Sequence, residues 1–160
     1  MSATLTGKYI DCGSRSAFYR IGKGRGFKEF PTKYDAKYSH RCQTIAAEAI
    51  LAPAVYSEVG RIRLPDGELS GWGYITQIAR PLSCTGNCHC DKCDYIECKY
   101  LGDIEDVTFL LDSEFGICYE DSHVGNFGWI RKNGIKHLVC VDFGPESCFF
   151  DEAETEECYA

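Results

Sequence analysis

Two polar side chains that could do chemistry stand close together in the segment 119–130, which reads YEDSHVGNFGWI. Asp121 and Asn126 are separated by small residues and lie just before an apolar run. A carboxylate on such a loop can accept a proton or orient a hydroxyl group. An asparagine oxygen beside it can bind a hard cation. The segment therefore has the groups needed to activate a hydroxyl next to a metal ion.

Asp142 adds a second oxygen ligand, at the end of the strand-like run 137–143. The Asn133-Gly134 pair before this run predicts a hairpin turn. Across a two-stranded hairpin, Asn126 and Asp142 would lie near each other, and oxygen ligands of this kind suit Mg²⁺. Any single Asp or Asn next to a glycine is more often only a turn former. The argument for a metal site therefore depends on the combination and its spacing.

The spacing D-x-x-x-x-N followed by D-F-G resembles the catalytic core of the protein-kinase-like superfamily. The form D-S-H-V-G-N is similar to the D-x-H-x-x-N motif of aminoglycoside phosphotransferase-like and other atypical kinases. The resemblance implies Asp121 as the catalytic base and Asn126 and Asp142 as Mg²⁺ ligands. It implies His123 as a support for the loop, and ATP as the nucleotide.

The segment 11–20, DCGSRSAFYR, resembles the glycine-rich loop of that family. Such loops use glycine because backbone N–H groups must approach phosphates closely. Only Gly13 of the three usual glycines is present, and Asp11 and Ser16 take the other two places. The resemblance implies Gly13 and Ser14 as part of the nucleotide-binding loop.

Further along the chain, the resemblance implies Lys28 as the strand lysine that contacts the inner phosphates, with Lys33 as the competing candidate. Glu48 matches the helix glutamate that pairs with this lysine, and its apolar neighbours predict that it faces inward. Thr76 and Gln77 would lie where the adenine edge meets backbone groups. In this interpretation Asp121, Lys28 and Glu48 form the catalytic set.

Period and turn signals predict an alternation of short strands and two helices. Strands are expected at 8–11, 16–22, 26–30, 54–59, 61–67, 71–79, 128–130 and 137–143, and helices at 41–51 and 102–115. The expected fold is α+β and kinase-like, with an N-terminal antiparallel sheet lobe carrying one helix (1–80) and a truncated C-terminal lobe (81–160). The second lobe would hold a Cys-rich insert (84–98) and the catalytic loop (119–146).

Only a short segment follows Gly144, whereas family members normally continue with an activation segment and several more helices. This departure leaves the phosphate acceptor open and puts activity in doubt. The alternative to a minimal kinase is a pseudokinase-type binding or regulatory module without catalysis. A homodimer could supply part of the missing cover.

The insert 84–98 holds cysteines at the short spacing C-x-x-x-C-x-C-x-x-C. Thiolates so close in sequence can close on one tetrahedral Zn²⁺. Free thiols or disulfides are equally open alternatives, and a zinc-stapled interaction protein is a further candidate function. The expected ligands, with Cys98 or His89 as substitutes, are Cys84, Cys88, Cys90 and Cys93.

Composition narrows the class of protein. The chain has 160 residues, of which 44% are hydrophobic and 26% charged, which is typical of about one globular domain. Its net charge of −7 argues against a nucleic-acid partner. No apolar run is long enough for a membrane span, and the N-terminus lacks an apolar signal core. We therefore expect a cytoplasmic, ATP- and Mg²⁺-dependent phosphotransferase that acts on hydroxyl groups, with a protein as substrate or partner.

The zinc hypothesis predicts about one zinc ion per chain in the purified protein, because four thiolates fill one tetrahedral site. Elemental analysis of the protein and of a variant with serine in place of Cys84, Cys88, Cys90, Cys93 and Cys98 would measure it. Metal in both proteins, or in neither, would leave the free-thiol and disulfide interpretations.

Overall fold

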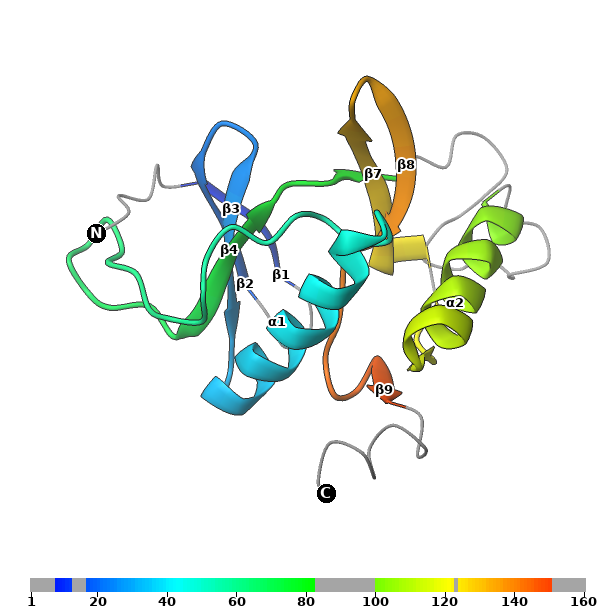
Figure 1. Cartoon of the computed structure of the whole chain (residues 1–160). Helices are drawn as coiled ribbons and strands as arrows, with labels where there is room; N and C mark the ends of the chain where they lie inside the picture. The colour runs from blue at the N-terminus through cyan, green and yellow to red at the C-terminus, as the bar shows by residue number, and fades with distance from the viewer. Residues whose placement is uncertain (1–7, 13–16, 83–99, 123, 151–160) are drawn as a thin grey trace.

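A computed structural model describes the fold of residues 8–12, 17–82, 100–122 and 124–150. Its first sheet has the strand order β1-β2-β3-β4, and all neighbouring strands are antiparallel (Figure 1). The four strands are β1 (Lys8–Cys12), β2 (Ala17–Gly22), β3 (Arg25–Phe30) and β4 (Trp72–Gln77). The strands expected at 8–11, 16–22, 26–30 and 71–79 are therefore confirmed to within a few residues.

Strand β3 presents different side chains to the two faces of this sheet, as a strand must. Phe27 packs with Ile62 on one face. Phe30 packs with Ala36 and Tyr74 on the other, beneath helix α1. Lys28 lies two residues before Phe30, so its side chain leaves the strand on the helix side, where its ammonium is 5.5 Å from the Phe30 ring centroid.

Helix α1 spans Lys33–Glu48 and covers one face of the sheet (Figure 1). It begins eight residues before the helix expected at 41–51, so that boundary was wrong. The helix starts early because Thr32 caps it: the Thr32 hydroxyl accepts a hydrogen bond from Asp35 N at 3.1 Å. The spacing of apolar residues along the chain gives no sign of this cap. The buried side of α1 carries small and polar residues, namely Ala36, Ser39, Cys42, Gln43 and Ala46.

The segment between α1 and β4 is less regular than the sequence predicts. In place of strands at 54–59 and 61–67, it contributes only isolated bridges, Val55 with Thr76, Gly60 with Gly73 and Arg63 with Leu69. Gly67, in the expected Pro-Asp-Gly turn, has a φ of +89°. The segment follows the edge of β4 but does not extend the sheet as a full strand.

The second half of the chain contains two small sheets and helix α2. Its elements are β5 (Arg80–Pro81), α2 (Leu101–Phe115), β6 (Ile117–Tyr119), η2 (Val124–Asn126), β7 (Phe127–Lys132), β8 (Ile135–Cys140) and β9 (Cys148–Phe150). One sheet has the order β5-β7-β8, and the other pairs β6 with β9. The predicted turn joins β7 to β8, with both Asn133 and Gly134 at positive φ. The predicted C-terminus of α2 at Gly116, φ +65°, is also confirmed.

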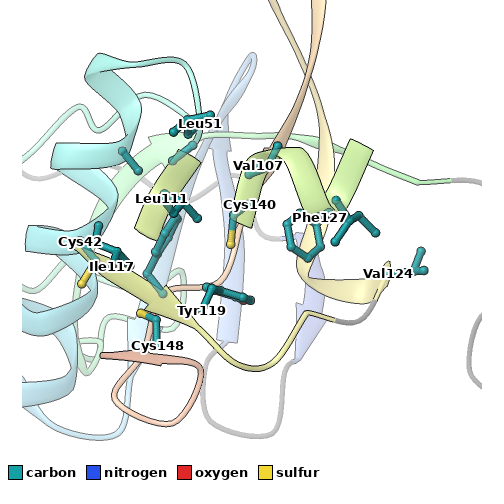
Figure 2. Packing of buried hydrophobic residues seen from close by; sticks show 14 of the residues in the cluster. Cys42, Leu51, Val107, Leu111, Ile117, Tyr119, Val124, Phe127, Cys140 and Cys148 are labelled. Carbon is teal, nitrogen blue, oxygen red and sulfur yellow. The ribbon is translucent and has the colours of Figure 1, made fainter. Parts of the chain in front are cut away.

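The largest hydrophobic cluster draws on both halves of the chain. Figure 2 shows Cys42 from α1, Leu111 from α2, Ile117 from β6 and Cys140 from β8 in one packed group. The lobe boundary expected near residue 80 stays a prediction. This shared core joins α1 to the segments around β6 and β8, so these elements are held in fixed relative positions.

The architecture is α+β, with small antiparallel sheets and two described helices. Within the described ranges, neither α1 nor α2 has the length and apolar character needed to cross a bilayer. These elements bring Val141 and Asp142, which follow β8, beside the Lys28 side chain of β3.

Gly73 is expected to be essential for the position of β3. An added methyl group there would overlap the Lys28 carbonyl oxygen and lie 2.8 Å from the Phe27 ring, whereas Gly102 on α2 has open space. Gly73→Ala should lower the free energy of unfolding by at least about 3 kcal/mol, because backbone cannot yield as a side chain can. Gly102→Ala should leave it unchanged or raise it by up to about 1 kcal/mol. Urea denaturation measures both, and equal values would contradict the packing described.

Candidate functional site

The β7–β8 hairpin brings the two predicted oxygen ligands together. Asn126 directly precedes β7, and Asp142 follows β8 by two residues. The hairpin register pairs Phe127 with Cys140, and Val141 N donates to Asn126 O at 2.8 Å. The backbone around Asn126 and Asp142 is thus joined by a direct hydrogen bond.

Asn126 is buried and holds the exposed Asp121 in place. Its Nδ2 donates to the Asp121 carbonyl oxygen at 2.7 Å and to the Asp121 carboxylate Oδ2 at 3.1 Å. With the nitrogen committed to Asp121, the amide oxygen is the atom of Asn126 that could bind a cation. Asp121 is exposed, so a hydroxyl group in solvent could approach its carboxylate.

Lys28 reaches this region from a strand more than a hundred residues earlier in the chain. Its Nζ donates to the Val141 carbonyl oxygen at 2.8 Å and lies 3.7 Å from Asp142 Oδ1. The Lys28 side chain is 9% exposed and that of Asp142 is 38% exposed. Burial of an unpaired ammonium is costly, so these two oxygens compensate the charge. The structure therefore brings together Lys28, Asp142, Asn126 and Asp121.

Asp142 is held at three of its oxygen atoms. Its carbonyl oxygen accepts from the Tyr119 hydroxyl at 2.7 Å and from Cys140 Sγ at 3.6 Å. The carboxylate has Lys28 near Oδ1 and accepts from the Ser147 hydroxyl at Oδ2, 3.3 Å. Both the backbone and the carboxylate of this residue are thus oriented before any ligand binds.

Buried neutral groups lie behind Asp142. Burial raises the pKa of the Cys140 thiol and of the Tyr119 hydroxyl far above their usual ranges, and nearby Asp142 adds to both shifts. The Cys148 thiol also has a raised pKa, first because of its hydrogen bond with Cys42 and then because of burial. These thiols stay protonated near neutral pH, so they are poor nucleophiles.

Glu48 does not occupy the place expected of it. It is the last residue of α1 and is exposed, so the prediction that it faces inward was wrong. The buried side of α1 carries Gln43 instead, five residues earlier, which is about one and a half helical turns and turns the residue to the other face. Gln43 Oε1 accepts from the Tyr74 hydroxyl at 2.7 Å, and its Nε2 donates to Thr76 Oγ1 at 2.6 Å.

Thr76 and Gln77 lie at the end of β4, immediately before the connection to β5. Thr76 is buried, and its hydroxyl donates to the Ala54 carbonyl oxygen at 3.0 Å, so its side chain is used within the fold. The Gln77 side chain accepts from Ala54 N at 3.1 Å. The Thr76 hydroxyl and the Gln77 amide oxygen therefore already have partners within the fold.

Several predicted site residues lie outside the described residues: Gly13, Ser14, His123, Cys84, Cys88, Cys90 and Cys93. In the part of the chain that the structure describes, no three histidine, cysteine, aspartate or glutamate side chains gather as a metal site. The zinc hypothesis and the glycine-rich loop stay predictions.

Sequence reasoning missed Gln43, which lies between α1 and β4, and Tyr119 and Ser147, which contact Asp142. Gln43 could have been found, because Ala36, Ser39, Gln43 and Ala46 recur at helical spacing on one face. Tyr119 and Ser147 carry no comparable signal, since their roles depend on the pairing of β6 with β9.

No protein-family model matches the chain, and a search of curated proteins finds no significant match. The interpretation of the site therefore rests on its own contacts.

Tyr119→Phe should test the anchoring of Asp142. Loss of the hydroxyl should lower the free energy of unfolding at pH 7 by about 1 to 2 kcal/mol, because a buried carbonyl loses its short hydrogen bond. The pKa of Tyr119 is raised in the folded protein, so its stabilisation is complete below the unfolded value near 10 and declines as the pH rises above it.

The variant should consequently lose less stability than wild type between pH 9 and 11. Urea denaturation across that range measures it, with the exposed Tyr34→Phe as the matched control. The same pH slope in wild type and Tyr119→Phe would contradict this account.

Proposed function

We propose that the protein is an ATP- and Mg²⁺-dependent phosphotransferase with a protein-kinase-like fold, acting on a hydroxyl group of a protein. The observation that carries the proposal is the meeting of Lys28 with Asp142 beside the Asn126–Asp121 pair. These four residues come from the two ends of the chain, in the order that the resemblance implies. If Asp121, Asn126 and Asp142 only formed surface turns, they would not be expected to gather around a buried lysine.

The order of the elements supports the same proposal. A hairpin and a lysine-bearing strand are followed by a helix that covers the sheet, then by β4 and the connection to β5 (Figure 1). After α2 come the loop with Asp121, the β7–β8 hairpin and the Asp142-Phe143-Gly144 motif. Phe143 is fully buried, which anchors the motif in the shared core.

The residues divide the chemistry in a physically sensible way. The oxygens of Asn126 and Asp142 would hold Mg²⁺, which neutralises charge on the transferring phosphoryl group when bound. Lys28 would bind phosphate oxygens, exchanging its contact with Asp142 for a new anionic partner. Phosphoryl transfer needs mainly positioning and charge stabilisation, and these three residues would supply both.

Asp121 would act as the base. In the reaction the acceptor oxygen forms a bond to the γ-phosphorus of ATP, and the bond from that phosphorus to the ADP oxygen breaks. The acceptor's proton passes to the Asp121 carboxylate. The hydrogen bonds from Asn126 fix the carboxylate next to the metal ligand.

Nucleotide binding without phosphate transfer is the second candidate function, and the exposure of Glu48 favours it. Kinase-like enzymes are expected to pair the strand lysine with a helix carboxylate. Here α1 presents the neutral Gln43 to β4, and among the described residues the oxygens that contact the Lys28 ammonium belong to Val141 and Asp142. A pseudokinase-type regulatory module could keep this arrangement.

Thermal-shift titration with ATP, with and without Mg²⁺, and incubation with γ-labelled ATP and protein acceptors would test both functions. We expect Mg²⁺-dependent stabilisation and transfer of label. Asp142→Ala should abolish transfer while the protein stays folded, because a metal ligand is lost. Lys28→Met should weaken nucleotide binding at least about tenfold, whereas the control Lys33→Met should not.

Label transfer by Asp142→Ala at the wild-type rate would remove the enzyme proposal. Mg²⁺-dependent stabilisation with no transfer by wild type would favour the binding module.

A further inference from the structure

The backbone after Asp142 turns back toward the loop that holds Asp121. Ser147 N and Cys148 N both donate to the Gly144 carbonyl oxygen, at 3.0 and 3.1 Å, which closes a tight turn. Strand β9 then pairs with β6, so that Cys148 lies opposite Tyr119. This pairing places Ser147 next to the residues that follow β6.

Ser147 contacts both predicted functional aspartates with different atoms. Its hydroxyl donates to Asp142 Oδ2 at 3.3 Å. Its carbonyl oxygen accepts from Glu120 N at 2.9 Å and from Asp121 N at 3.3 Å. The residue is 5% exposed, whereas the Asp142 side chain is 38% exposed, so the bond between them is partly buried. One buried serine thus joins the loop of the proposed base to the proposed metal ligand.

We propose that Ser147 is a positioning residue that sets the orientation of the Asp142 carboxylate for Mg²⁺, an inference that rests on the proposed function. The carboxylate is held from two sides, with Lys28 Nζ 3.7 Å from Oδ1 and the Ser147 hydroxyl on Oδ2. Without that hydroxyl, both oxygens are free to turn toward the ammonium. Lys28 would then compete with Mg²⁺ for the same charge.

The two contacts of Ser147 can be separated by substitution. Ser147→Ala removes the hydroxyl and keeps the carbonyl group, so the backbone of Glu120 and Asp121 should stay in place. The apparent Mg²⁺ affinity should fall about tenfold, which is the lower end of the effect of hydrogen-bond partners behind metal ligands. The turnover at saturating Mg²⁺ and ATP should change little, because Asp121 keeps its position.

The test is a Mg²⁺ titration of the full chain at saturating ATP. The melting temperature is measured at each Mg²⁺ concentration by thermal shift, so the result does not depend on turnover. Ser147→Cys keeps nearly the same volume with a much weaker donor and should show a shift in the same direction. Ser147→Cys replaces Ser147→Ala in the test if Ser147→Ala fails to fold. Ser147→Thr, which retains a hydroxyl, should restore most of the affinity. Ser70→Ala is the matched control, since Ser70 is also buried and, within the described residues, its hydroxyl bonds the backbone groups of Ile62 and Gly71.

The outcomes separate this inference from the proposed function. If wild type shows no Mg²⁺-dependent stabilisation by ATP, the proposed function fails, and the role of Ser147 fails with it. If wild type is stabilised by ATP and Mg²⁺, and Ser147→Ala and Ser147→Cys need the same Mg²⁺ concentration as wild type for that stabilisation, only the role of Ser147 is overturned. An equal shift in Ser70→Ala would also overturn it, because general destabilisation would then explain the effect.

Discussion

The contact of the Lys28 ammonium with the Val141 carbonyl and the Asp142 carboxylate is the interaction on which the site depends. A buried ammonium requires compensating oxygens, and the chain supplies them from its opposite end. The bond therefore ties the first sheet to the backbone after β8. Any rearrangement that separates these elements would leave a charge buried without a partner. The partial exposure of Asp142 leaves the same carboxylate accessible to a cation.

Neutral hydrogen bonds surround this charged contact. The Tyr119 hydroxyl orients the backbone of Asp142, and Asn126 orients Asp121. Between α1 and β4, Gln43, Tyr74 and Thr76 form a buried polar network that needs no charge. Burial raises the pKa of Tyr74 far above its usual range, so this network stays neutral near pH 7. The network thus adds no charge to the interior between α1 and β4.

The shared hydrophobic core explains how weakly regular segments can hold such a site. Strands β6 and β9 are only three residues long, yet Ile117 and Cys148 are almost fully buried in that core (Figure 2). Packing against α1 and α2 fixes them more strongly than their few ladder hydrogen bonds could. The positions of the neighbouring segments, 120–122 and 144–147, follow from this packing.

The sequence alone determined the local elements whose signals are contained in neighbouring residues. The turn at Asn133-Gly134, the end of α2 at Gly116 and the nearness of Asn126 to Asp142 across a hairpin all follow from short-range chemistry. The start of α1 was predicted wrongly because the N-cap at Thr32, and not the spacing of apolar residues, sets where the helix begins.

Only the tertiary structure decided which distant residues meet. In the sequence the apolar neighbours of Glu48 indicate that it faces inward, but the packing of α1 against the sheet exposes Glu48. Ser147 has no distinguishing neighbours, and it matters only because β9 pairs with β6. Contacts over such separations are set by the packing of whole elements, and no local pattern of residue types records that packing.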